Sequence, residues 1–283
     1  MKWIAAAALP CLILQAAAAP FPKPQRSMPL PRARPARIMS LKVCTDELLL
    51  DLVPASRIAS VTFLSQEKAA LRQWPQAAHV AVNHGSAEEV LAAKPDLILT
   101  DSFTAPPLRP LLAKSGARIV EIPPAGNFDQ IRAVTRQVAA AVGEVARGEQ
   151  LIAAMDAELR QVAAHRPAMP VTVAEWGGGG YVPGTGGLFD TMLTAAGARN
   201  VERGSFGYYD VEALIAKNPD LLVFGDTYGG SASLRDDQNL HPALMKRYAG
   251  RRVSYAALYG CGVPEAAHVT HQLQDAIAAA ARK

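Results

Sequence analysis

The sequence predicts an α/β protein with two Rossmann-like lobes that are joined by a single long interdomain helix. Two observations support this fold class. The phrase at 88–99 recurs at 212–223 without a gap, and an unbroken helical pattern separates the two copies. Each copy combines apolar residues at helical spacing, a Pro that ends the helix and a continuous apolar run, which is typical of a buried parallel strand. We therefore expect two lobes of one design with a ligand cleft between them.

The N-terminal lobe follows two segments that lie outside the fold. Residues 1–18 have a basic start, an apolar stretch and a run of alanines, which is typical of a secretory signal peptide. A basic, Pro-rich leader at 19–36 should be extended. The lobe itself is expected at 37–144. Its strands are expected at 37–41, 57–62, 79–82, 97–99 and near Ile119, with helices beginning near Cys44 (Thr45 or Asp46 as N-cap), at 66–73, at 88 and at 128–142.

The interdomain helix is expected at 145–166. Apolar residues keep helical spacing there without an internal Pro, and some twenty residues would form a helix of roughly 30 Å. The C-terminal lobe should occupy 167–283. Its strands are expected at 171–174, 221–223 and 252–256, its helices at 188–196, 212–217, 242–248 and 264–281, and a Gly-rich loop at 176–187.

The positive charge of the chain does not indicate a nucleic-acid binder. The formal charge is +4, but residues 1–37 contain six basic residues and no acid, so the folded part is slightly acidic. A nucleic-acid binder should be basic on its folded part. With the signal peptide, this predicts an exported protein of the bacterial periplasm, which we expect to be a monomer.

No motif indicates catalysis. The Gly-rich loop at 176–187 lacks the spacing of a phosphate-binding loop and of a dinucleotide fingerprint. A nucleophile elbow is absent, and the histidines are scattered along the chain. We predict no catalytic residue, no cofactor and no resident metal.

The predicted binding residues lie just after strands. Ligands of open α/β sheets bind outside the carboxyl ends of the strands, and aromatic residues are concentrated in these loops, which suits a large, partly apolar ligand. The predicted ligand-binding residues are Cys44, Asn83, His84, Asp101, Trp176, Tyr181, Phe206, Tyr208, Tyr259 and Cys261.

Cys44 and Cys261 have three possible interpretations. Both follow predicted strands, one in each lobe. They could contact a ligand or metal, they could be inert small side chains, or they could form the disulfide that an oxidising compartment favours. A permanent bridge would oppose opening of the cleft.

Glu88 and Glu212 occupy matching places in the repeat. Each could be an ordinary first-turn acid that interacts favourably with the helix dipole. Alternatively, the two form a symmetric pair of acidic contacts, one on each lobe, for basic sites on a partner protein.

The sequence resembles the periplasmic binding proteins that deliver cobalamin and ferric siderophores to ABC importers. The resemblance covers 37–283 and rests on the run 37–50, on the phrase Glu-x-x-Leu/Ile-Ala-x-x-Pro-Asp-Leu in both halves, on the bridging helix and on the ending 258–264. It implies two lobes on one rigid helix, a small closure, and docking of Glu88 and Glu212 on arginines of the permease.

The resemblance also implies a ligand class. By similar placement, the pocket would include Cys44, Asn83, Asp101, Tyr181 and Phe206. The cobalamin binder has tryptophans in place of Asn83, Asp101 and Phe206, so the resemblance does not identify cobalamin as the ligand. We expect a metal chelate, which could be a ferric siderophore, haem or a corrinoid. Two alternatives are a receptor for bare metal ions that uses Cys44, His84 and Cys261, and an exported enzyme that resembles the chelatases.

Overall fold

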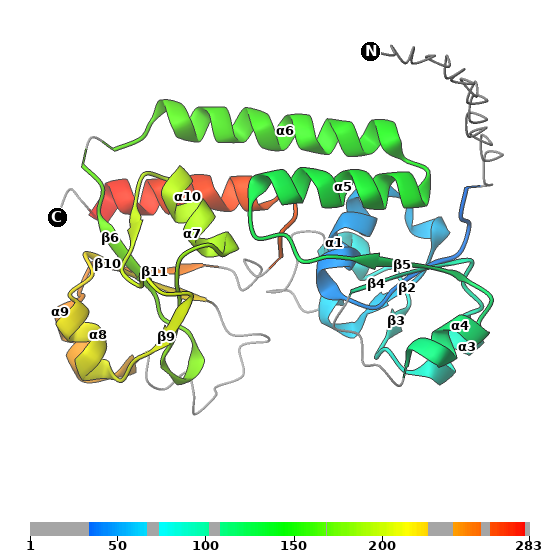
Figure 1. Cartoon of the computed structure of the whole chain (residues 1–283), viewed down its shortest axis with the longest axis horizontal. Helices are drawn as coiled ribbons and strands as arrows, with labels where there is room; N and C mark the ends of the chain where they lie inside the picture. Colours follow the sequence, from blue (N-terminus) through cyan, green and yellow to red (C-terminus); the bar gives the residue numbers. More distant parts are fainter. Residues whose placement is uncertain are drawn as a thin grey trace, which may run out of the picture. The chain divides into compact units, whose positions relative to one another are not determined.

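The computed structural model describes residues 34–66, 74–101, 108–167, 169–225, 240–255 and 261–280. Two separate parallel sheets form the centres of the two lobes (Figure 1). The N-terminal sheet has the strand order β3-β2-β1-β4-β5, and the C-terminal sheet has the order β11-β10-β6-β8. This confirms the predicted fold class of two α/β lobes and excludes a single continuous sheet in the described part of the chain.

The described part of the N-terminal lobe contains five strands and five α-helices. They are β1 (Ile38–Ser40), α1 (Val43–Leu52), β2 (Ile58–Thr62), α2 (Trp74–Ala77), β3 (Val82–Asn83), α3 (Ala87–Ala93), β4 (Leu97–Asp101), α4 (Arg109–Lys114), β5 (Arg118–Ile122) and α5 (Phe128–Val142). Strands β1 and β4 lie at the centre of the sheet and are fully buried along Ile38–Ser40 and Leu97–Thr100. These continuous apolar runs are why the strands pack under helices on both faces.

The C-terminal lobe repeats this design. Its elements are β6 (Thr172–Glu175), β7 (Tyr181–Pro183), α7 (Leu188–Ala195), β8 (Arg199–Asn200), β9 (Phe206–Tyr208), α8 (Val211–Lys217), β10 (Leu221–Gly225), α9 (Pro242–Arg247), β11 (Arg252–Tyr255) and α10 (Ala266–Ala280). Strand β10 pairs with β6 and β11 as β4 pairs with β1 and β5.

The sequence repeat is also a repeat of hydrogen bonds at the helix ends. Ser86 and Asp210 are the N-caps of α3 and α8, and each side chain accepts a hydrogen bond from the backbone N–H three residues later. Both helices end on a residue in the left-handed region, Lys94 with φ 44° and Asn218 with φ 50°. The Pro that follows prevents either helix from continuing.

The Asp of each repeat, which directly precedes β4 or β10, accepts hydrogen bonds from the start of the neighbouring strand, β1 or β6. The Asp96 carboxylate accepts hydrogen bonds from the backbone N–H groups of Ala36 and Arg37, just before β1. The Asp220 carboxylate accepts from the backbone N–H and the hydroxyl of Thr172, at the start of β6. The Pro-Asp pair therefore sets the register of the central strand in both lobes.

Helix α6 (Val145–Ala164) contacts both lobes. Arg132 of α5 forms an ion pair of 2.6 Å with Asp156, and Gln274 of α10 donates a 2.8 Å hydrogen bond to the carbonyl oxygen of Val162. The predicted interdomain helix is confirmed.

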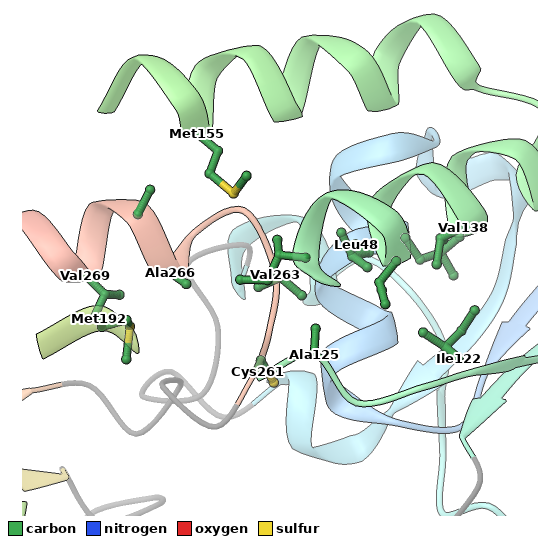
Figure 2. Close-up of a cluster of buried hydrophobic side chains, with 14 of the residues drawn as sticks. Leu48, Ile122, Ala125, Val138, Met155, Met192, Cys261, Val263, Ala266 and Val269 are labelled. Atoms are coloured by element: carbon green, nitrogen blue, oxygen red, sulfur yellow. The ribbon is translucent and has the colours of Figure 1, made fainter. Parts of the chain in front are cut away.

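A continuous apolar core lies beneath α5, α6 and α10 (Figure 2). It contains side chains from both lobes, among them Leu48, Ile122, Ala125, Val138, Met155, Met192, Val263, Ala266 and Val269. The two lobes therefore share buried apolar surface, which opposes their separation.

Two local predictions were wrong. The N-cap of α1 is Lys42, not Thr45 or Asp46, because the Thr45 hydroxyl donates to the Lys42 carbonyl oxygen and the Asp46 carboxylate accepts from Thr62 at the end of β2. The loop predicted at 176–187 contains β7, which pairs with β9 as a two-stranded antiparallel sheet. Three residues are too few to show a strand periodicity in the sequence.

Candidate ligand-binding site

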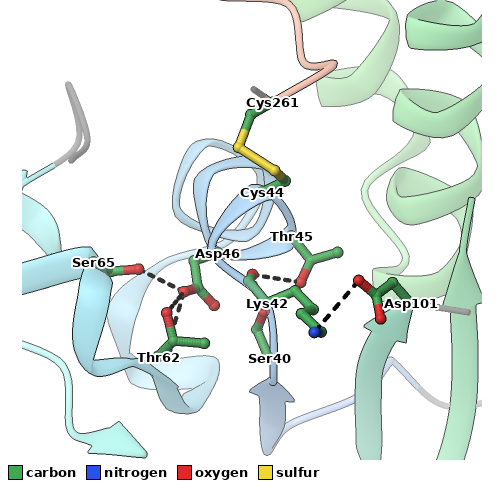
Figure 3. Close-up of a disulfide and its surroundings, with 9 residues drawn as sticks. All are labelled: Ser40, Lys42, Cys44, Thr45, Asp46, Thr62, Ser65, Asp101 and Cys261. Atoms are coloured by element: carbon green, nitrogen blue, oxygen red, sulfur yellow. Dashed lines mark hydrogen bonds and ion pairs between the residues drawn. A yellow bond between two sulfur atoms is a disulfide. The ribbon is translucent and has the colours of Figure 1, made fainter. Parts of the chain in front are cut away.

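A disulfide joins the two lobes at the carboxyl ends of their strands. Cys44 in the first turn of α1 is bonded to Cys261, which precedes α10, with a Cα–Cα distance of 5.1 Å (Figure 3). Of the three interpretations from the sequence, the structure has the disulfide. The alternative of a bare metal-ion receptor with Cys44 and Cys261 as ligands is therefore wrong, because a metal ligand must be a free thiolate. Within the described residues, no group of three or more His, Cys, Asp or Glu side chains could hold a metal ion.

A cavity of about 320 Å³ lies beside this disulfide. Its walls come from the segments that follow β1, β4 and β5 and from Gly262 and Val263 of the other lobe, as expected for the strand ends of an α/β sheet. Most of the lining is apolar, and one ion pair of 3.6 Å joins Lys42 and Asp101 at its edge. Cys44 and Asp101, two of the predicted ligand-binding residues, both line this cavity, and their contact with a ligand stays a prediction.

Sequence reasoning missed part of this wall. Lys42 and the segment Ile122–Ala125 line the cavity but were not among the predicted residues. The signal was available, because the rule that ligands lie beyond strand ends applies to the strand at 118–122 as well. Pro123 and Pro124, which follow this strand, have apolar side chains without hydrogen-bonding groups, so the sequence did not indicate that they contact a ligand.

Asp46 holds the loop after β2 against α1. It is completely buried, and its carboxylate accepts hydrogen bonds from the Thr62 backbone N–H (3.0 Å), the Thr62 hydroxyl (2.5 Å) and the Ser65 hydroxyl (2.5 Å) (Figure 3). Burial raises the pKa of Asp46 from 3.8 to about 6, although these hydrogen bonds oppose the shift.

His84 forms a compact cluster at the end of β3. Its ring stacks on the Phe63 ring with centroids 5.0 Å apart and planes inclined by 20°. Its Nδ1 lies 3.0 Å from a carboxylate oxygen of Glu89. The same carboxylate accepts hydrogen bonds from the backbone N–H groups of Ser86 and His84. The bond from the Ser86 backbone first, then the one with the His84 ring and the one from the His84 backbone, lower the pKa of Glu89 to about 2.

Three aromatic side chains gather on the β7–β9 pair of the other lobe. The rings of Tyr181, Phe206 and Tyr208 have centroid separations of 5.7 to 6.2 Å. Their exposed fractions are 38, 57 and 66%, so each ring has a large uncovered area. Gly180 brings the two segments together, because a Cβ there would lie 2.1 Å from the Tyr209 carbonyl oxygen.

Two predicted binding residues have structural roles instead. The Asn83 side chain is 1% exposed, and its amide donates 2.9 Å hydrogen bonds to Ser40, Ser60 and Val61 inside the sheet. Trp176 is fully buried in the core of the C-terminal lobe. Ligand contact by these two was wrongly predicted, because position after a strand does not reveal which way a side chain turns.

Tyr259 lies outside the described residues.

Glu88 and Glu212 are the second residues of α3 and α8 and are both exposed. Among the described residues, neither carboxylate has a hydrogen bond or an ion pair. Their matching positions agree with the repeat, and their role as docking contacts stays a prediction.

A family model described as periplasmic binding protein matches residues 38–243. The chain belongs to the periplasmic binding protein family. No match was found among curated protein sequences. None of the described helices has the length and apolar character needed to span a membrane.

Solved structures of periplasmic binding proteins share the fold. An apo haem-binding protein from Roseiflexus sp. RS-1 is 24% identical with a TM-score of 0.73, over 86% of this chain and 98% of that one. A haem-binding protein from Pseudomonas aeruginosa is 25% identical with a TM-score of 0.68, over 86% and 92%. A vitamin B12 binding protein of Vibrio cholerae is 16% identical with a TM-score of 0.68, over 88% and 99%.

Proposed function

We propose that the protein is the periplasmic substrate-binding component of an ABC transporter and captures a metal chelate, namely a ferric siderophore, haem or a corrinoid. The observation that supports this most directly is the exposed ring cluster of Tyr181, Phe206 and Tyr208. Uncovered aromatic rings grouped in one place indicate a surface for a large, partly apolar ligand. Two related structures are named as haem binders and one as a vitamin B12 binder.

Binding, not bond-making, is the proposed activity. The ligand would lie between the strand-end loops, with the rings of the C-terminal lobe on one side and the His84 and Asp101 loops on the other. The disulfide between Cys44 and Cys261 fixes one point of each lobe. Closure around the ligand would therefore be small.

Delivery would use the two exposed acids. Glu88 and Glu212 stand at equivalent positions of the two lobes, and each would pair with a basic residue of one half of the inner-membrane permease. We also propose that residues 1–18 direct export and that the mature protein acts as a monomer in the periplasm.

Titration of the purified protein with three ligands tests the function. Tryptophan fluorescence would be followed as ferric protoporphyrin IX, aquocobalamin or a ferric trihydroxamate is added. We expect saturable one-to-one binding of at least one, and weaker binding in Phe206→Ala with the free energy of unfolding unchanged. The exposed Met169, replaced by Ala, is the matched control. Failure to bind any of the three would contradict the proposal.

A further inference from the structure

The arrangement around His84 fixes which ring nitrogen is free. The Glu89 carboxylate accepts hydrogen bonds from the backbone N–H groups of His84 and Ser86, and the bond from Ser86 is part of the capping box of α3, so the position of the carboxylate does not depend on the His84 side chain alone. A carboxylate only accepts hydrogen bonds, so the 3.0 Å contact requires the proton to be on Nδ1 of the imidazole. In the neutral imidazole Nε2 then carries a lone pair, and it has no hydrogen-bond partner among the described residues.

The ring is also held in orientation. Phe63, at the end of β2, covers one face of the imidazole, and Glu89 holds one edge. The His84 side chain nevertheless remains 66% exposed, so the Nε2 edge is open to a ligand. A histidine whose second nitrogen is bonded to a carboxylate is the usual arrangement of a metal-ligating histidine, because the carboxylate fixes the tautomer and raises the basicity of the ligand.

One imidazole cannot hold a bare metal ion, and the described residues offer no group of three ligands around it. It can, however, occupy one axial position of a metal that a chelate already holds. A hexadentate siderophore leaves its iron no open position, whereas the metal of a tetrapyrrole has axial positions above and below the ring plane. The cluster therefore favours one of the three proposed ligand classes.

We propose that Nε2 of His84 binds the metal of a tetrapyrrole chelate, displacing an axial water molecule, and that Glu89 is its positioning residue. The proposal rests on the proposed function and narrows it. The metal keeps its oxidation state, and the only bond formed is the one between nitrogen and metal.

Spectroscopy of the protein loaded with ferric protoporphyrin IX tests this. We expect the absorption and electron paramagnetic resonance spectra of an imidazole-bound ferric haem in the wild type. His84→Gln should lose this signature, with affinity reduced by at least roughly tenfold. His79→Gln, a change of another exposed histidine of the same lobe, should match the wild type.

Glu89→Gln removes the negative charge of the carboxylate and should leave the fold unchanged. Gln can replace Glu in a capping box, so α3 should persist. We expect a signature that remains but is altered, and an affinity reduced by about tenfold.

The outcomes distinguish the two proposals. If His84→Gln has the wild-type spectrum, His84 is not the ligand, while the receptor function stands. If the ferric trihydroxamate binds and ferric protoporphyrin IX and aquocobalamin do not, the inference is overturned and the receptor function again stands. If none of the three binds, both are overturned.

Discussion

At the scale of single residues, Asp46 shows how burial and hydrogen bonding compete. Its carboxylate is removed from water, which favours the neutral acid, while Thr62 and Ser65 donate hydrogen bonds that favour the anion. Burial has the larger effect, and the pKa rises to about 6. The first turn of α1 therefore contains an acid with a raised pKa, two residues after Cys44 of the disulfide.

This has a consequence for stability. The folded-state pKa of Asp46 lies above its ordinary value of 3.8, so the folded protein binds more protons than the unfolded chain between pH ~4 and ~6. The contribution of Asp46 is fully present below this window and is lost as the pH rises through it. Across this window, the contribution of Asp46 to the free energy of unfolding of the wild type should fall by about 3 kcal/mol. In Asp46→Asn this pH-dependent decrease should be absent.

Urea unfolding of the wild type and Asp46→Asn at intervals from pH 4 to pH 7.5 would measure this difference. The control is Asp275→Asn, which changes an exposed acid on α10 and should follow the wild type. Parallel pH profiles for wild type and Asp46→Asn would show that burial does not shift this group.

At the scale of elements, the backbones of the two lobes are in close contact where the segment before α10 meets the segment after β5. A Cβ on Gly262 would lie 2.2 Å from the Ala125 carbonyl oxygen and 2.6 Å from the Ala125 Cβ. Only glycine fits at this distance. The hydroxyl of Thr191 adds a 3.0 Å hydrogen bond to the Gly126 carbonyl oxygen, so backbone and side-chain contacts both fix this junction.

Gly262→Ala should therefore destabilise the protein. We expect the free energy of unfolding to fall by about 1–3 kcal/mol, because the new methyl group meets backbone that must shift. Gly126→Ala is the matched control, since its Cβ would have no atom nearer than 3.6 Å. Chemical denaturation compares the two, and equal stabilities would contradict the close approach.

At the scale of the whole molecule, the two lobes are linked through a shared core, helix α6 and the Cys44–Cys261 disulfide. The disulfide joins residues that are 217 apart in sequence, so it strongly restricts the unfolded chain. Its position beside the cavity also limits how far the strand ends can separate.

We expect the double variant Cys44→Ser with Cys261→Ser to unfold with a free energy lower by about 2–5 kcal/mol. Thermal unfolding with and without reductant measures this effect. Reductant should shift the transition of the wild type and leave that of the double variant unchanged. Two free thiols in the untreated wild-type protein would contradict the disulfide.

Docking is a second property of the whole molecule. With Glu88→Lys and Glu212→Lys, we expect transport to decrease at least about tenfold, because a like charge would face each basic site of the permease. Chelate affinity of the purified variant should equal that of the wild type. Asp275→Lys serves as the control for charge reversal elsewhere. A parallel loss of affinity and transport would show that these acids act on the ligand and not on the permease.

Much of this protein could be predicted from its sequence because the information is local or repeated. The Glu-to-Leu phrase encodes a capped helix, a left-handed stop and a buried strand, and it occurs twice, so two α/β lobes follow from pattern alone. Tyr181, Phe206 and Tyr208 were predicted as ligand-binding residues in loops after strands. The structure places them on one strand pair with their rings exposed, and their contact with a ligand stays a prediction.

Only the tertiary structure decided the pairing of Cys44 with Cys261, the inward turn of Asn83 and Trp176, and the contact of His84 with Phe63 and Glu89. Each of these depends on where residues distant in sequence meet, or on which side of the chain a side chain points. Hydrophobic periodicity fixes which elements form, since it reflects the burial of one face. Hydrophobic periodicity does not reveal which residue of one lobe meets which residue of the other, because the packing of the assembled core sets the distances between them.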